Sequence, residues 1–456
     1  MDRYDGAEAG EVDLLALERT QYPLSCGHHR CGVRLLRRYC GTCSYVVAAS
    51  WLRMAISFVE GTEAYVETIY YWQCAVPLEY AEREMLNVEL KDSVTDIYFR
   101  FIQFSLGIYD GKEFLDGSAL KKLDWAAFYE FAKKQTLVGV VFDGIQKLLK
   151  DAAPNLELLM RWFGINQKIM QRNNVLNEAT VAIYNKVKDS GYSCCILKGQ
   201  GNAVMYPNPL IRIPGDVDVW VNAGRDEIRS LAHSLAENAN GHVDDESFNH
   251  IGLTVNGITV ELHSTPGFMA NFVYNRRLQR WLKQNVDEQC NNMVALPNDA
   301  GFVAVPTHSF NIVYQLYHLY HHYFYEGVGL RQVVDYYFVL VKSEERRVKN
   351  SIALERELKC LGLWKFAGAM MYVLYKVMGM PKDKMIAPMD AKRGQMLLDD
   401  ILNGGNFGHY DKHHVLGHNL LRMYRDARLL RYYPAEALSE PIFRVWHFFW
   451  RMKCQK

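Results

Sequence analysis

The sequence predicts an α+β fold, in which a small mixed sheet is flanked by helical regions on its N-terminal and C-terminal sides. Apolar residues recur three and four residues apart before about residue 190 and again after Pro306, which is typical of amphipathic helices. Between these regions, short apolar runs and one Asn-Gly pair indicate strands and a hairpin. A chain of 456 residues exceeds one ordinary core, so two or three domains are expected.

Residues 1–84 show neither helical nor alternating periodicity, and regular amphipathic spacing begins only at Met85. Half of the ten cysteines lie in this segment. A zinc site could be formed by four of them and two histidines, namely Cys26, His28, His29, Cys31, Cys40 and Cys43. Only Cys40 and Cys43 have the tight pair spacing of a zinc module, so unpaired thiols are favoured. We expect a weakly ordered N-terminal extension over 1–84, and one hypothesis places it outside the natural folded protein.

Residues 85–190 predict a helical region. The segment "DWAAFYEFAKKQ" and the long run from Glu157 into "NKVKDSG" both repeat their apolar residues at three and four positions. Gly191 follows the second run in the manner of a helix C-terminus.

Residues 191–300 predict a small α/β domain, because the period changes after Gly191. The expected elements are a buried strand over 192–197, a strand "VDVWV", a helix over 225–239 and a hairpin around Asn256-Gly257. Residues 301–456 predict a C-terminal helical domain, with helices over 307–327 and from 329 onward, and further helices within 350–380 and 415–452.

Three carboxylates are the strongest candidates for chemistry. Asp216 and Asp218 interrupt an apolar run, and their i, i+2 spacing puts both on one face of a strand. Glu261 likewise lies between apolar residues that face away from it, on the hairpin strand "GITVELHS". Convergent carboxylates suit Mg²⁺, and such sites can hold two ions about 3.5–4 Å apart. The structural alternative for the aspartate pair is a solvated strand end or turn.

A phosphate-binding turn is expected just upstream of the acidic strand. Lys198 and the backbone around Gly199 and Gly201 lie at a strand end before a short helix, where they could hold a phosphate chain. Arg212 could neutralise a second phosphate, and its alternative is an ordinary surface arginine. Gly215 allows a tight backbone turn into the acidic strand.

Histidines give weaker signals. His318, His322 and Glu326 fall on one face of a helix, where they could form a second metal site, contact the nucleotide, or be a polar stripe on an aromatic-rich packing helix, which we favour. His263 shares the strand face of Glu261 and could tune that acid, bind the acceptor, or be a satisfied histidine at a strand end. His250 opens the hairpin near the same residues.

These motifs resemble a known family. The order "ILKG", "YP", Arg212, "GDVD" and "VELH" looks like the polymerase-beta-like nucleotidyltransferase superfamily, and most resembles its group of uncharacterised nucleotidyltransferases. The resemblance runs from about 90 to 345 and includes "KKQTLVGVVFDGIQKL" and "GLRQVVDYY". It implies a polymerase-beta-like palm domain and transfer of a nucleoside monophosphate from a nucleoside triphosphate to a hydroxyl acceptor, with release of pyrophosphate.

The resemblance also implies roles for individual residues. Asp216 and Asp218 match the metal-binding aspartates, and Glu261 matches the third acidic residue and the proton acceptor. Lys198 and Gly199 occupy the turn that holds the triphosphate. Arg331 becomes a candidate phosphate or base contact, although its spacing from Asp335 first suggests an intrahelical pair.

Two departures from the family pattern leave alternatives open. The turn reads Lys-Gly-Gln-Gly where most of the superfamily has Gly-Ser, and the third acid is Glu261 where aspartate is commoner. A catalytically inactive nucleotide-binding or interaction protein on the same fold is therefore the main alternative. Metal-assisted phosphate hydrolysis, which requires no acceptor, is a third.

Charge and hydropathy limit the partners. A net charge of +1 disfavours a long nucleic acid and an anionic membrane surface. The most apolar stretch, residues 44–61, is interrupted by Arg53 and falls short of the roughly 20 residues that span a bilayer. The first twenty residues are acidic and polar, unlike a secretory signal, so a cytoplasmic location is expected. A small-molecule or protein acceptor fits best, and ATP is one candidate nucleotide.

Overall fold

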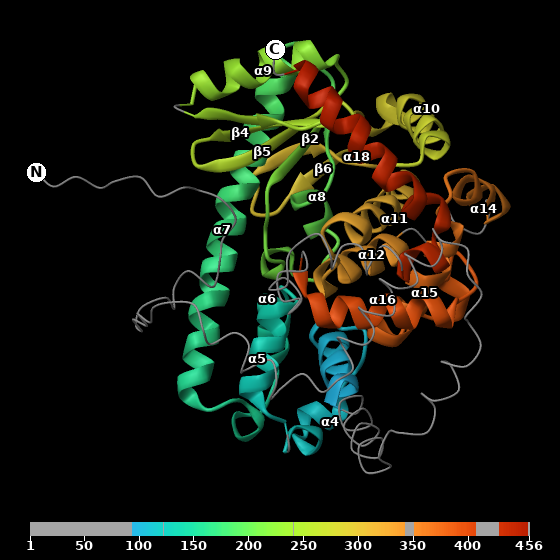
Figure 1. Cartoon of the computed structure of the whole chain (residues 1–456). Coiled ribbons are helices and arrows are strands. Elements are labelled where there is room, and N and C mark those ends of the chain that lie inside the picture. Colours follow the sequence, from blue (N-terminus) through green and yellow to red (C-terminus); the bar gives the residue numbers. More distant parts are fainter. Residues whose placement is uncertain (1–93, 122, 240, 343–350, 407–427, 455–456) are drawn as a thin grey trace, which may run out of the picture. The chain divides into compact units, whose positions relative to one another are not determined.

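The computed structural model describes residues 94–121, 123–239, 241–342, 351–406 and 428–454. The predicted N-terminal extension over 1–84 and its cysteines lie outside these residues. In the described part, helices surround a five-stranded mixed sheet, with a separate two-stranded sheet beside it (Figure 1). This arrangement confirms the predicted α+β class.

Helices form the chain that precedes the sheet, as the apolar spacing predicted. Residues 94–105 are helical, followed by α4 (Lys112–Leu115), η2 (Ser118–Leu120), α5 (Trp125–Lys134), α6 (Val138–Ile145), η3 (Lys150–Ala152) and α7 (Leu156–Asp189). Asp124 caps α5 by accepting hydrogen bonds from two backbone N–H groups, and Asn155 caps α7 in the same way with one. Gly191, at φ 89°, takes the left-handed conformation that ends the long helix.

The five-stranded sheet has the strand order β1-β2-β5-β4-β3. Its elements and their connections are β1 (Cys194–Ile196), α8 (Gln200–Ala203), η4 (Pro209–Ile211), β2 (Val217–Val221), α9 (Arg225–Glu237), β3 (His242–Glu246), β4 (His250–Val255) and β5 (Ile258–His263). Only β2 and β5 run parallel; the other neighbours are antiparallel. The predicted strands, helix and hairpin are confirmed, whereas β3 was not predicted.

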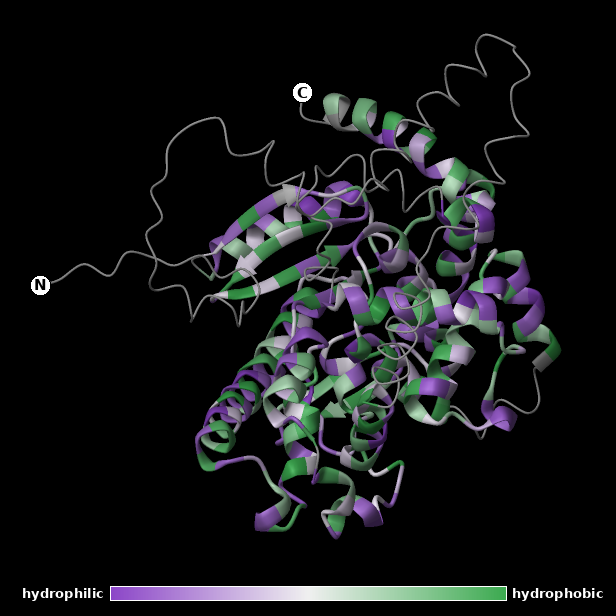
Figure 2. Cartoon of the chain, turned by 60° about the horizontal axis from the view of Figure 1, so that its bottom comes forward, coloured by the Kyte–Doolittle hydropathy of each residue, from purple (hydrophilic) through white to green (hydrophobic). Residues whose placement is uncertain are grey.

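The β4–β5 hairpin turns at the predicted Asn-Gly pair. Asn256 has φ 52° and Gly257 has φ 73°, the two positive values that a tight hairpin turn of this kind requires. Hydrophilic and hydrophobic residues alternate along the strands of the sheet (Figure 2). This alternation follows from the two-residue period of a strand, which places apolar residues on the buried side.

The remaining elements complete the C-terminal part of the described chain. They are α10 (Phe272–Gln289), β6 (Met293–Leu296), β7 (Gly301–Ala304), α11 (His308–Tyr325), α12 (Leu330–Lys342), α14 (Ser351–Cys360), α15 (Trp364–Met378), η5 (Lys382–Lys384), α16 (Ala391–Gly404), the helical residues 428–432, and α18 (Pro434–Cys454). Neither α10 nor the β6–β7 pair was predicted. None of the described helices is both long and apolar enough to cross a membrane.

Helices pack against the sheet from several directions. Helix α9 contacts β3, β4 and β5, while α7 runs past β1 and β2 (Figure 1). Helix α11 contributes Phe310, whose ring stacks on Trp281 at 4.4 Å and lies 5.8 Å from the ring of Trp220 in β2. Aromatic contacts of this kind add to the energy of apolar burial, and they fix α11 against the acidic strand.

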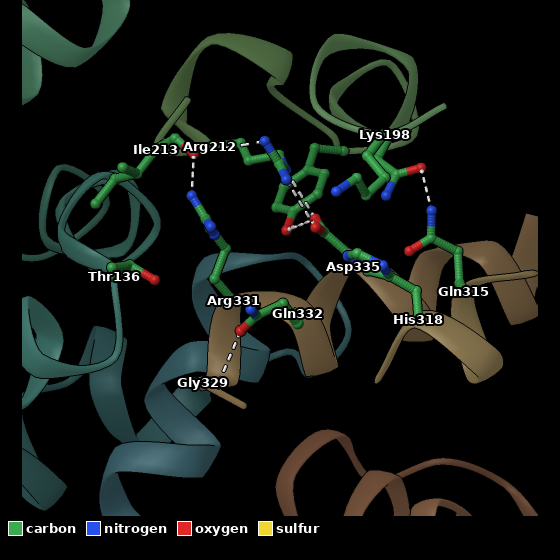
Figure 3. Close-up of polar contacts among 12 residues, drawn as sticks. Thr136, Lys198, Arg212, Ile213, Gln315, His318, Gly329, Arg331, Gln332 and Asp335 are labelled. Carbon is green, nitrogen blue, oxygen red and sulfur yellow. Dashed lines mark hydrogen bonds and ion pairs between the residues drawn. The ribbon is translucent and has the colours of Figure 1, made fainter. Parts of the chain in front are cut away.

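A buried ion pair ties the chain before β2 to helix α12. The Arg212 guanidinium donates from Nε and Nη2 to the two carboxylate oxygens of Asp335, each at 2.8 Å (Figure 3). The Tyr206 hydroxyl donates to the same carboxylate at 2.7 Å. Arg331 donates instead to the backbone carbonyl of Ile213 at 3.0 Å. The predicted intrahelical pair of Arg331 with Asp335 is therefore wrong, because Asp335 bonds a different arginine.

Replacing Asp335 with alanine should strongly destabilise the protein, because it leaves the Arg212 guanidinium buried without a counter-charge. We expect a loss of about 3–5 kcal/mol in the free energy of unfolding, measured by urea denaturation. Glu355→Ala is the matched control, since it breaks a single exposed pair with Lys359 and should change stability by about 1 kcal/mol or less. Equal losses in the two variants would contradict the role assigned to the buried pair.

Candidate active site

Three carboxylates converge where β2 and β5 run side by side. The parallel register places Asp218 directly beside Glu261, and Asp216 immediately precedes β2. One carboxylate oxygen from each of the three residues lies within 4.8 Å of the others. Val217 and Val219, which alternate with the aspartates, are buried. The convergence predicted from the i, i+2 spacing and the hairpin is thus present in the structure.

Two basic side chains lie between these carboxylates. The Lys198 ammonium is 3.1 Å from Oδ2 of Asp218. The His263 Nε2 atom is 2.9 Å from Oδ1 of Asp218 and 3.2 Å from Oε2 of Glu261. Asp218 is 2% exposed, so its charge would be costly to bury without such partners. Lys198 and His263 together provide the positive charge that an acidic pair in an apolar strand requires.

The two aspartates respond to this environment in opposite directions. Repulsion from Asp218, together with burial, raises the pKa of Asp216 to about 7. Burial alone would raise the pKa of Asp218 too, but Lys198 and His263 outweigh it and hold that pKa below its usual value. Burial would lower the pKa of Lys198, yet the surrounding carboxylates raise it. The site therefore contains one firmly ionised carboxylate beside one that is easily protonated.

The histidines of the hairpin act on the third acid. Burial favours the neutral form of Glu261, but the hydrogen bond from His263 lowers its pKa below the usual value. Burial also opposes the charge on His263, and its carboxylate partners still raise its pKa to about 9. His250 has Nε2 at 3.5 Å from Oε1 of Glu261, and burial lowers its pKa. These contacts agree both with tuning of the acids by His263 and with a satisfied histidine at a strand end.

The backbone of the turn after β1 adopts a conformation that suits glycine, as its glycines suggested. Gly199 has φ 52° and ψ −113°, a combination that residues with a side chain rarely adopt. A Cβ atom on Gly199 would lie 3.3 Å from the backbone carbonyl oxygen of Asp216, so the turn passes close to the acidic strand. Gly201 packs against Val305, and its N–H donates to the Lys198 carbonyl at 2.9 Å. The structure thus shows a packing role for Gly201, and its phosphate contact stays a prediction.

Arg212 and Arg331 differ in how fully their guanidinium groups are hydrogen-bonded. Arg212 is 6% exposed and is held by Asp335, so the alternative of an ordinary surface arginine is wrong. Its phosphate contact stays a prediction. Arg331 keeps its buried Nε without a hydrogen-bond partner among the described residues. Burial lowers the pKa of Arg331, and the charge of Asp216 acts on it in the opposite direction. Of the three carboxylates, Asp216 is therefore the one whose charge acts on Arg331.

The polar residues of α11 bond to one another. His318 and His322 share a hydrogen bond of 2.8 Å between their Nε2 atoms, and His322 Nδ1 lies 2.7 Å from Glu326. Burial first, and then the Lys198 charge, lowers the pKa of His318 well below its usual value. The arrangement agrees with the favoured interpretation of a polar stripe, and these three residues are not among the described groups whose geometry could hold a metal ion.

A buried amide cluster that the sequence analysis missed supports the site from α7. Asn173 donates to the carbonyls of Leu210 and Arg212 at 2.7 and 2.8 Å, and Gln200 donates to Asn177. The two Asn173 bonds fix η4 and the residue that follows it, from which the chain leads into the acidic strand. The sequence signal that could have revealed this cluster is the spacing of Asn173 and Asn177, which are four residues apart and therefore lie on one face of the helix.

Comparison with known proteins agrees with this geometry. A family model described as an uncharacterised nucleotidyltransferase matches residues 121–379, which is more than half of the chain. The matched region contains all three carboxylates, Lys198 and the Arg212–Asp335 pair. None of the curated proteins matches the chain. The family match confirms the resemblance inferred from the sequence motifs, and the chain belongs to the family of uncharacterised nucleotidyltransferases.

Proposed function

We propose that this nucleotidyltransferase moves a nucleoside monophosphate from a nucleoside triphosphate to a hydroxyl group of a small-molecule or protein acceptor. The observation that carries the proposal is the cluster of Asp216, Asp218 and Glu261, whose oxygens lie within 4.8 Å of one another beside the Lys198 ammonium. Such a cluster beside a cation is suited to a triphosphate and its divalent ions. The net charge of +1 supports a small or protein acceptor over a long nucleic acid.

The donor set fits magnesium. Asp216, Asp218 and Glu261 supply only oxygen atoms, the ligand type that Mg²⁺ prefers, and their mutual repulsion is relieved by added positive charge. We propose two ions, both held by these three residues. Bound Mg²⁺ would lower the pKa of the acceptor hydroxyl and balance charge on the triphosphate.

Side chains of the protein would bind the phosphates and accept the proton. Lys198 can exchange its bond with Asp218 for one with a phosphate oxygen, and Arg331 is the second candidate cation for the phosphates. The acceptor oxygen forms a bond to the α-phosphorus, the bond from that phosphorus to the bridging oxygen breaks, and pyrophosphate leaves. The hydroxyl proton passes to Glu261, which His263 helps to keep ionised.

Changing Asp216 and Asp218 to asparagine should abolish both magnesium-dependent nucleotide binding and pyrophosphate release. The test titrates ATP, GTP, CTP and UTP into the purified chain with and without Mg²⁺, followed by a pyrophosphate assay with candidate acceptors. Loss of one such carboxylate should lower turnover by about 10³-fold or more, because charge stabilisation at the reacting phosphate is lost. Circular dichroism checks that the variants remain folded.

Asp244→Asn is the matched control, since Asp244 is exposed on the neighbouring strand β3. It should bind nucleotide and release pyrophosphate as the wild type does. Equal nucleotide binding by the wild type and the double variant would overturn the proposed site. Magnesium-dependent binding with no pyrophosphate release from any acceptor would favour the catalytically inactive alternative.

Magnesium binding should weaken on acidification through neutral pH. The raised pKa of Asp216, about 7, means that this carboxyl is protonated below that pH and ionised above it. Since a metal ion must displace the proton, affinity should fall by about tenfold for each pH unit below 7 and level off above it. Calorimetric titration of Mg²⁺ between pH 5.5 and 8.5 measures this, and a flat profile across that range would contradict it.

Replacing Lys198 with methionine should weaken nucleotide binding while preserving most of the side-chain volume. Loss of one charge-assisted bond to phosphate, worth about 1.5–3 kcal/mol, corresponds to a roughly tenfold to hundredfold higher dissociation constant. Lys188→Met is the control, because Lys188 is exposed at the end of α7. A Lys198 variant that binds nucleotide as tightly as the control would remove Lys198 from the phosphate site.

A further inference from the structure

Glu261 lies between two imidazole rings as well as beside the aspartates. His250 and His263 face each other across the antiparallel β4–β5 pair, with ring centroids 5.1 Å apart. Their Nε2 atoms lie 3.5 Å and 3.2 Å from the two carboxylate oxygens of Glu261. One ligand atom from each of the three residues lies within 4.8 Å of the other two. The hairpin therefore builds a second group of potential ligands from nitrogen and oxygen.

This group differs chemically from the three carboxylates. Two imidazoles and one carboxylate suit borderline transition metals, whereas Mg²⁺ prefers oxygen ligands alone. With metal–ligand bonds of about 2.0–2.1 Å, neighbouring ligand atoms of a tetrahedral zinc site are about 3.3 Å apart. The two nitrogen–oxygen distances from Glu261 already lie close to that value.

The far sides of both rings show what metal binding would require. Nδ1 of His250 and Nδ1 of His263 are buried without a hydrogen-bond partner among the described residues. A neutral imidazole that binds a metal through Nε2 carries its proton on Nδ1, which then needs an acceptor such as a bound water. Neither Nδ1 atom is committed to another described residue, so both are open to such an acceptor.

We propose that His250, Glu261 and His263 form a binding site for one divalent transition-metal ion, represented by Zn²⁺ or Co²⁺. The inference rests on the proposed function only in sharing Glu261 with the magnesium site, because neither aspartate is needed for the histidine ligands. The ion would bind at the edge of the carboxylate cluster. The enzyme would then combine one transition metal with magnesium.

The test uses metal alone on the purified chain after chelator treatment. Calorimetry with Zn²⁺ should show one site that binds at least about a hundredfold more tightly than Mg²⁺. Co²⁺ should give visible absorption bands that report nitrogen ligation. His250→Ala and His263→Gln should each weaken Zn²⁺ binding by at least about tenfold and remove the cobalt bands, whereas the double variant Asp216→Asn/Asp218→Asn should keep both.

His242→Ala is the matched control, because His242 is exposed on β3, and it should bind Zn²⁺ as the wild type does. Zinc binding that is no tighter than magnesium binding, or that survives both histidine changes, would overturn the inference. If His263→Gln fails to fold, as judged by circular dichroism, His250→Ala decides alone. Magnesium-dependent nucleotide binding without a zinc site would refute this inference and leave the proposed function standing. A zinc site without nucleotide binding would refute the proposed function and leave this inference standing.

Discussion

The electrostatic repulsion among three converging carboxylates, one buried and two half-buried, is the constraint on which the rest of this structure depends. The parallel pairing of β2 with β5 sets Asp218 beside Glu261, and the chain entering β2 adds Asp216. Like charges so close together and so far from water need nearby cations. Lys198 and His263 meet that need in the protein alone, and their contacts with the carboxylates are those that an incoming metal or phosphate would exchange.

Residues outside the carboxylate cluster hold the acidic strand in position. The Arg212–Asp335 pair joins the chain before β2 to α12, and Asn173 on α7 holds the backbone carbonyls of Leu210 and Arg212 in the same segment. The net stability that a buried, doubly hydrogen-bonded pair of this kind contributes is small, since its desolvation offsets much of its attraction. Residues far apart in the sequence thus position the acidic strand.

The site also shows how one side chain can belong to two chemical environments. Glu261 faces the oxygen ligands of Asp216 and Asp218 on one side and the imidazoles of His250 and His263 on the other. Because metals differ in their preference for oxygen and nitrogen, the two sides favour different ions. Family membership defines the reaction class, while these particular side chains define the chemistry available to this member.

The sequence by itself determined the α+β class, the strands that carry Asp216, Asp218 and Glu261, and the Asn256-Gly257 turn, because strand period and turn chemistry are local properties. It also placed Lys198 and His263 near the acids through their neighbouring positions. Only the tertiary structure decided that Asp335 pairs with Arg212 instead of Arg331, that Gly201 packs inward, and that His250 faces Glu261. Those outcomes depend on contacts between segments distant in sequence, which no local spacing encodes. The strand β3 escaped prediction for a related reason, since its polar sequence "HVDDE" becomes a strand only by pairing with β4.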